Sequence, residues 1–139
     1  EMIHAVDSLK LAAEINKQAA RNSRIIKCLL QVHIAREESK FGFDRDELLV
    51  MIQQGRFDSF EQLSFSGLMG MATHTKDKEI IRGEFRHLKD LFKRIKATAT
   101  SDNFNFQELS MGMSNDYQIA IEEGSTIIRI GSDIFGARN

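Results

Sequence analysis

Two short turns near the end of the chain combine glycine with serine, and each follows an apolar run. The first is Ser110-Met111-Gly112-Met113-Ser114, and the second is Gly131-Ser132. Glycine permits close approach of the backbone to a bound group, and serine adds a hydroxyl donor. If the turns follow neighbouring parallel strands, their N–H groups and hydroxyls can converge on one anion. The pattern indicates a phosphate site, and two ordinary surface turns are the alternative.

Arg129 is the other residue whose position indicates chemistry, because it lies within the apolar run Ile127-Ile128-Arg129-Ile130. A buried guanidinium needs a partner, since an unpaired buried charge is costly. Strand alternation places Arg129 and Ile127 on one face, with Ile128 and Ile130 on the other. Two interpretations stay open: a functional cation that faces a barrel interior, and a structural ion pair with an acid.

The remaining reactive residues give no catalytic pattern. The four histidines lack metal-ligand spacing; we expect His33 to be a core histidine and His74 to lie on the functional rim after the third strand. Cys28, the one cysteine, lies in an apolar run and is expected to be a buried core thiol. No nucleophile elbow, Walker loop or paired catalytic carboxylate occurs. We therefore assign no catalytic residue and no metal ligand.

The elements that must position these residues alternate along the whole chain. Five strands are expected, centred near Ile3, Leu30, Leu68, Leu109 and Ile128. The clearest helix has apolar residues spaced by three and four, at Ile81, Phe85, Leu88, Phe92 and Ile95. Asp7-Ser8 and Asp44 begin two further helices, and a short one stops at Gly124. This alternation predicts an α/β fold with a parallel sheet and right-handed crossovers.

Composition limits the class of partner. The 139 residues have a formal net charge of −1 and are 42% hydrophobic, which suits one globular unit. Near-neutral charge gives no argument for nucleic-acid or membrane binding, and no apolar stretch approaches the roughly 20 residues of a membrane span. We expect a cytoplasmic protein that binds neither. Because the chain begins at Glu1 directly in an apolar segment, we also expect a missing N-terminal part.

Five segments in order along the chain resemble the pyridoxal-5′-phosphate homeostasis protein family, which has the fold of the alanine racemase N-terminal barrel. They are Ile3 to Ser8, Glu37 to Phe43, Gly67 to Met69, Leu109 to Asp116 and Arg129 to Gly136. The resemblance implies a partial (β/α)8 TIM barrel, with strands four to eight in residues 1–139 as the C-terminal portion of a single domain. In such a barrel the five strands pair in sequential order and the helices lie on the outer face. The strand that bears the Schiff-base lysine would precede Glu1, and Lys40 does not match that lysine.

The resemblance also implies the cofactor, pyridoxal 5′-phosphate, whose place phosphate or sulfate can take. Gly112, Met113, Ser114, Gly131 and Ser132 match the family's phosphate cradle, and Arg129 matches an arginine near the pyridine nitrogen. A cation there disfavours protonation of the ring nitrogen and weakens the ring as an electron sink. Two departures occur: Gly70-Met71-Ala72-Thr73 stands where prolines are common, and Ser132 where threonine is common.

Three functional interpretations follow. The leading one is a pyridoxal-phosphate carrier without catalytic turnover, involved in intracellular vitamin B6 and amino-acid homeostasis. An alternative is a pyridoxal-phosphate-dependent amino-acid racemase, which needs a lysine base and an opposing tyrosine that Tyr117 does not match. A third is a barrel fragment that binds another phosphorylated metabolite. Open edge strands near Ile3 and Ile128, with an exposed interior leucine at Leu29 or Leu30, predict self-association or pairing with a separate N-terminal fragment.

Overall fold

The computed structural model describes residues 2–37 and 41–129, and within them strands and helices alternate. The strands are Met2–Val6 (β1), Ile26–Gln31 (β2), Leu63–Gly70 (β3), Phe104–Met113 (β4) and Ile127–Arg129 (β5). The helices are Leu9–Arg21 (α1), Arg45–Gln53 (α2), Lys78–Thr98 (α3) and Tyr117–Glu122 (α4).

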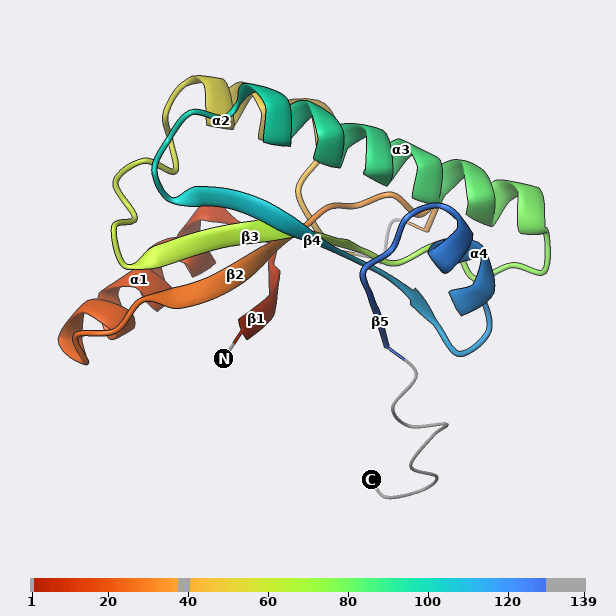
Figure 1. Ribbon diagram of the computed structural model, residues 1–139, viewed down its shortest axis with the longest axis horizontal. Helices are drawn as coiled ribbons and strands as arrows, with labels where there is room; N and C mark the ends of the chain where they lie inside the picture. The colour runs from red at the N-terminus through yellow and green to blue at the C-terminus, as the bar shows by residue number, and fades with distance from the viewer. Residues whose placement is uncertain (1, 38–40, 130–139) are drawn as a thin grey trace, which may run out of the picture.

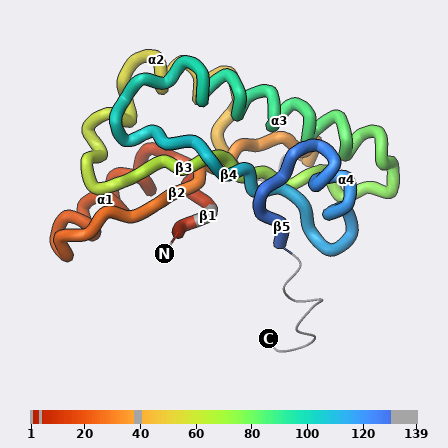
Figure 2. Tube along the Cα trace, viewed as in Figure 1, coloured from red at the N-terminus to blue at the C-terminus, as the bar shows by residue number. Residues whose placement is uncertain are grey.

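The strands form one parallel sheet in the order β1-β2-β3-β4-β5, which confirms the predicted pairing and order. Figure 1 shows a curved sheet with α2 and α3 above it, while β1 and β5 descend on the other side. The tube in Figure 2 shows the same half-barrel arrangement. No helix in the described ranges is long and apolar enough to cross a membrane.

Local sequence explains where the helices begin. The Ser8 hydroxyl accepts from the Leu11 N–H at 3.1 Å, and the Asp44 carboxylate accepts from the Asp46 and Glu47 N–H groups. These side chains satisfy donors that the first helical turn leaves unpaired, as predicted for both helices. The predicted stripe of α3 is buried at all five positions, from Ile81 to Ile95. Tertiary packing of this apolar stripe therefore fixes the longest helix against the sheet.

The core between sheet and helices ends in an aromatic cluster near the amino ends of the strands. The Phe57 ring centroid lies 5.3 Å from that of Phe65, and the Phe65 centroid lies 5.1 Å from that of Phe104. The sequence predicts an irregular segment from Arg56 to Ser64. In the structure this segment supplies the fully buried Phe57, and β3 already begins at Leu63.

The two faces of the sheet differ. Alternation along β2 places Cys28 and Leu30 in the core under the helices, and Leu29 and Gln31 on the opposite face. Leu29 and Leu30 are both fully buried, so the prediction that one of them is exposed is wrong. Within the described residues, β1 and β5 each pair with a neighbour on one side alone.

Candidate functional site

The predicted site residues meet at the carboxyl ends of β4 and β5. In the register of these strands, Ser110 is opposite Ile127 and Met113 is opposite Arg129, with an irregularity between them. The Arg129 Nη1 atom donates to the Ser110 hydroxyl oxygen at 2.9 Å. The structure thus brings together Ser110, Gly112, Met113, Ser114 and Arg129. The other two predicted residues, Gly131 and Ser132, lie outside the described ranges.

A turn closed by two hydrogen bonds follows β4. The Asp116 N–H donates to the Met113 carbonyl at 3.1 Å, and the Met113 N–H donates to the Asp116 Oδ1 atom at 2.7 Å. Ser114, half-buried at the second position of this turn, makes no side-chain hydrogen bond with the residues that the structure describes. The Met113 N–H thus already has an acceptor, whereas the Ser114 hydroxyl remains available to a bound group.

Gly112 is required for packing as well as for the turn. Its φ is +107°, a region that favours glycine. A Cβ atom at this position would lie 2.7 Å from the Ala120 Cβ and 3.1 Å from the Ile128 Cγ2. The sequence explained this glycine by close approach to an anion. The structure adds that α4 and β5 come too close to the β4 backbone here for any larger residue.

Arg129 has a donor that lacks a protein partner. Its Nη2 atom is buried and forms no hydrogen bond with any described residue. Burial lowers the pKa of Arg129, and the nearby charge of Asp116 opposes that shift. The ion pairs among the described residues involve Arg82 and Arg86, so the acid that acts on Arg129 is Asp116, by charge and without a direct ion pair. Because buried donors are rarely left unpaired, this atom fits an acceptor on a bound group, such as a pyridine nitrogen.

Side-chain hydrogen bonds hold the loop that follows β3, where the family commonly has prolines. The Thr73 N–H donates to the Glu84 Oε1 atom at 2.7 Å, and the Thr73 hydroxyl donates to Glu84 Oε2. The same hydroxyl accepts from the Arg36 N–H at 2.8 Å. The His74 N–H donates to Glu37 Oε2 at 2.7 Å. One buried carboxylate of α3 thereby joins the loops after β2 and β3.

His74 lies on this carboxyl-end rim, as predicted. It lines a cavity of about 570 Å³ together with Lys76, Lys78 and Asn115, the residue after Ser114. His33 is half-buried, and its Nε2 atom lies 3.0 Å from the Glu37 carbonyl oxygen. No group of three or more histidine, cysteine or acidic side chains in the described ranges could hold a metal ion.

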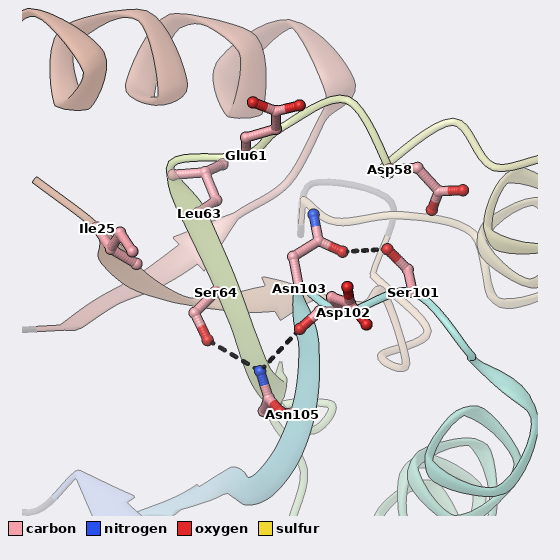
Figure 3. A pocket seen from close by; sticks show the side chains of 9 residues that line it. All are labelled: Ile25, Asp58, Glu61, Leu63, Ser64, Ser101, Asp102, Asn103 and Asn105. Carbon is pink, nitrogen blue, oxygen red and sulfur yellow. Dashed lines mark hydrogen bonds between the residues drawn. The ribbon is translucent and has the colours of Figure 1, made fainter.

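A second cavity, of about 530 Å³, lies at the opposite, amino ends of β3 and β4 (Figure 3). Its polar side chains bond to one another: Ser101 donates to Asn103, and Asn105 donates to Ser64 and to the Asp102 carbonyl. Carboxylates of Asp58, Glu61 and Asp102 also line it, and they would repel a phosphate, because no lysine, arginine or histidine among the described residues lines this cavity to offset their charge. This cavity therefore does not suit the predicted anion.

Cys28 agrees with its predicted role. The side chain is fully buried in the core, and burial raises the pKa of the thiol to about 11. A thiol in this state is unreactive, because the thiolate is the nucleophile.

Sequence reasoning missed two residues at the functional edge, Asp116 and Glu84. Both carboxylates are buried, with exposed fractions of 9% and 8%. Asp116 stands in the quoted Leu109 to Asp116 segment, but its position before a helix indicated no more than capping. Glu84 gave no signal, because a charged residue in an amphipathic helix normally belongs to the solvated face.

Comparisons with known proteins identify the family. The family model described as alanine racemase, N-terminal domain, matches residues 1–139. A pyridoxal phosphate homeostasis protein from Helicobacter pylori is 39% identical over 134 residues, covering 96% of this chain and 56% of the relative. One from Aquifex aeolicus is 34% identical over 137 residues, covering 99% and 58%. The chain thus spans less than two thirds of the curated relatives it matches.

Solved structures give the same result. PipY of Synechococcus elongatus without pyridoxal phosphate superposes with a TM-score of 0.87 at 31% identity, covering 97% of this chain and 61% of PipY. PipY with pyridoxal phosphate bound gives a TM-score of 0.82 at 29% identity, covering 97% and 60%. The predicted resemblance is confirmed, and the chain belongs to the alanine racemase N-terminal domain family.

Proposed function

We propose that this chain is the C-terminal portion of a single pyridoxal-phosphate-binding (β/α)8 barrel, in which β1 to β5 are strands four to eight. In this proposal the protein carries the cofactor without catalytic turnover and serves intracellular vitamin B6 and amino-acid homeostasis. Three findings support it: the names of the curated relatives, the PipY structure with pyridoxal phosphate bound, and the share of each relative that the chain spans.

The observation that carries the proposal is the Arg129 guanidinium, which bonds Ser110 through one nitrogen and leaves the other buried and unpaired. We assign the phosphate to the Ser114 hydroxyl, on the turn that the Gly112 and Met113 backbone forms, completed by Gly131 and Ser132; the Met113 N–H itself is bonded to Asp116. When bound, the cofactor supplies an aldehyde and an electron-withdrawing ring. Arg129 would direct Nη2 at the pyridine nitrogen, and a cation there keeps that nitrogen unprotonated.

The racemase alternative is not favoured. The curated relatives carry the homeostasis name rather than a racemase name. Tyr117, the one tyrosine of the chain, is the first residue of α4, and its Cα lies in the packing around Gly112.

The setting belongs to the same proposal. We place the protein in the cytoplasm, with pyridoxal phosphate as its partner and with neither nucleic acid nor membrane as a ligand. The chain by itself should associate with a second copy or with a separate N-terminal fragment, because β1 and β5 each have one described neighbour.

Titration with pyridoxal phosphate tests the proposal in the protein that carries this chain. Replacing Ser114 and Ser132 together by alanine should weaken binding by about tenfold or more for each lost bond to the charged phosphate. The matched control is Ser64→Ala with Ser101→Ala, two serines at the amino-end cavity, which should leave affinity unchanged. Equal affinity of the Ser114/Ser132 variant and the wild type would remove both serines from the cradle.

Two further readouts separate the alternatives. The wild type should not interconvert the enantiomers of alanine, whereas turnover would favour the racemase. Pyridoxal phosphate should compete with inorganic phosphate for the site. If the protein binds phosphate but shows no preference for pyridoxal phosphate, the site belongs to a different phosphorylated metabolite.

A further inference from the structure

Asp116 is a buried carboxylate whose position needs an explanation. It is 9% exposed, and an ionised carboxylate is costly to bury unless hydrogen bonds or a nearby cation compensate. It occupies the N-cap position of α4, where an aspartate normally accepts from the first helical N–H groups. Its side chain makes no such bond. The carboxylate therefore serves something other than the helix.

What the carboxylate contacts is the turn that precedes the helix. Asp116 Oδ1 accepts from the Met113 N–H at 2.7 Å, and the Asp116 N–H returns a bond to the Met113 carbonyl at 3.1 Å. The two residues thus close a ring around Ser114 and Asn115. Inside this ring the Ser114 hydroxyl has no partner among the described residues.

The same carboxylate also acts on the neighbouring strand. Met113 is the register partner of Arg129, so the turn and the guanidinium lie side by side at the sheet edge. The charge of Asp116 favours the cationic form of Arg129 and opposes the effect of burial. Asp116 is therefore joined to both halves of the proposed cofactor site, to the turn by a hydrogen bond and to Arg129 by charge.

We infer that Asp116 is a positioning residue of this site: its carboxylate closes the Met113–Asp116 turn and holds the Ser114 hydroxyl ready for a phosphate. This inference rests on the proposed function. A turn that is ordered before binding does not lose conformational entropy when the phosphate arrives. Without an acceptor at position 116, the Met113 N–H is left unpaired and the turn keeps one closing bond.

Three proteins test the inference: the wild type, Asp116→Ala and Asp116→Asn. Asparagine keeps an oxygen that can accept from the Met113 N–H but carries no charge. We expect Asp116→Ala to weaken pyridoxal phosphate binding by about tenfold, and Asp116→Asn to bind within about threefold of wild type. Gln118→Ala, an exposed change on the same helix, is the control and should bind as wild type does.

Pyridoxal, which lacks the phosphate, separates a positioning role from a general structural role. Asp116→Ala should cost much less pyridoxal affinity than pyridoxal phosphate affinity, because the bond to the Met113 N–H acts through the phosphate turn, while the Arg129 guanidinium stays cationic at neutral pH without Asp116. Equal losses for both ligands, or no rescue by asparagine, would overturn the inference. If Asp116→Ala does not fold, amide hydrogen exchange decides: the Met113 amide should be protected in the wild type and in Asp116→Asn, and fast exchange in the wild type would contradict the closed turn.

Failure of the inference and failure of the proposed function give different results. If the wild type does not bind pyridoxal phosphate, the proposed function is wrong. If the wild type binds it and Asp116→Ala binds it equally well, the function stands and Asp116 has no positioning role.

Discussion

At the scale of single residues, alternation predicted the face of Arg129 but not its partner. An arginine inside an apolar strand is easily recognised in the sequence, because burying its charge costs free energy that a partner must offset. Ser110 lies 19 residues away and is opposite Ile127, while Arg129 is opposite Met113, so the contact between these two side chains depends on the register of β4 with β5. One sequence does not show this register. The contact that Asp116 makes could not be predicted either, because a carboxylate before a helix usually caps that helix.

Cys28 provides a prediction at this scale. With its pKa raised to about 11, roughly one thiol in a thousand is ionised at pH 8. A disulfide reagent added to the native protein at pH 8 should therefore label Cys28 very slowly, and labelling in urea should be fast. Rapid stoichiometric labelling of the native protein would contradict its burial.

The same shift predicts how stability depends on pH. The folded pKa of Cys28 lies above the unfolded value of 9.0, so folding favours the protonated thiol. This stabilisation is complete below pH 9 and is lost as the pH rises towards 11. Cys28→Ala should show a smaller fall in the free energy of unfolding across that range.

At the scale of elements, the sequence predicted the helix α3 and the turn at Gly112. It did not predict the close packing of α4 and β5 that requires a glycine at this position. A stripe of five apolar residues fixes a helix, because burying it stabilises one orientation. By contrast, the 2.7 Å approach that a Cβ at Gly112 would make to Ala120 depends on how α4 sits on β4. In the loop after β3, where the family commonly has prolines, hydrogen bonds between Thr73 and Glu84 hold the backbone. One sequence cannot show such contacts.

Two glycine substitutions should have opposite effects on stability. Gly112→Ala should lower the free energy of unfolding by about 2 kcal/mol or more, through its positive φ and its clash with Ala120. Gly83→Ala is the matched control in α3: nothing lies within 4 Å of its Cβ, so it should stabilise by about 0.5–1 kcal/mol. Urea unfolding measures both, and a neutral Gly112→Ala would contradict the tight packing of α4.

The contact between α3 and α4 should depend on pH. Arg82 bonds Glu122 and Glu123 at 2.7 Å each, and Arg86 bonds Glu123 at 3.0 Å. The hydrogen bond from Arg82 lowers the pKa of Glu123, so this stabilisation is present above the unfolded pKa and is lost as the pH falls through the folded value.

Glutamine variants measure this contact. Glu123→Gln should destabilise near pH 7 more than Glu122→Gln does, because the Glu123 side chain is 13% exposed and that of Glu122 is 60% exposed. The two variants should become more similar in acid and in high salt. Thermal unfolding at several pH values provides the comparison, and equal effects at neutral pH would contradict it.

At the scale of the whole molecule, periodicity predicted the fold class and most boundaries, and the resemblance to a barrel family predicted the strand order. Parallel strands joined by helices admit few topologies, and the chain adopts the expected one. The aromatic cluster around Phe57 and the burial of Leu29 were not predicted, because both depend on the curvature of the sheet. The cofactor came from motif resemblance rather than from physics, since two glycine and serine turns fit any phosphate.

The edges of the sheet predict association. Within the described residues, β1 pairs with β2 alone and β5 with β4 alone, so unpaired backbone groups remain on both outer strands. We expect the 139-residue chain, produced alone, to elute from size-exclusion chromatography with a mass by light scattering above 15.8 kDa. A stable monomer of 15.8 kDa would show that the edges are protected in another way.

A crystal structure of the protein that carries this chain, in complex with pyridoxal phosphate, tests the assignment of the site directly. We expect the phosphate within hydrogen-bonding distance of the Ser114 hydroxyl, about 2.7 Å, and the pyridine nitrogen beside Arg129 Nη2. The Met113 N–H should keep its bond to Asp116. A phosphate bound elsewhere, or an Arg129 whose Nη2 contacts no part of the ligand, would contradict the assignment of the site.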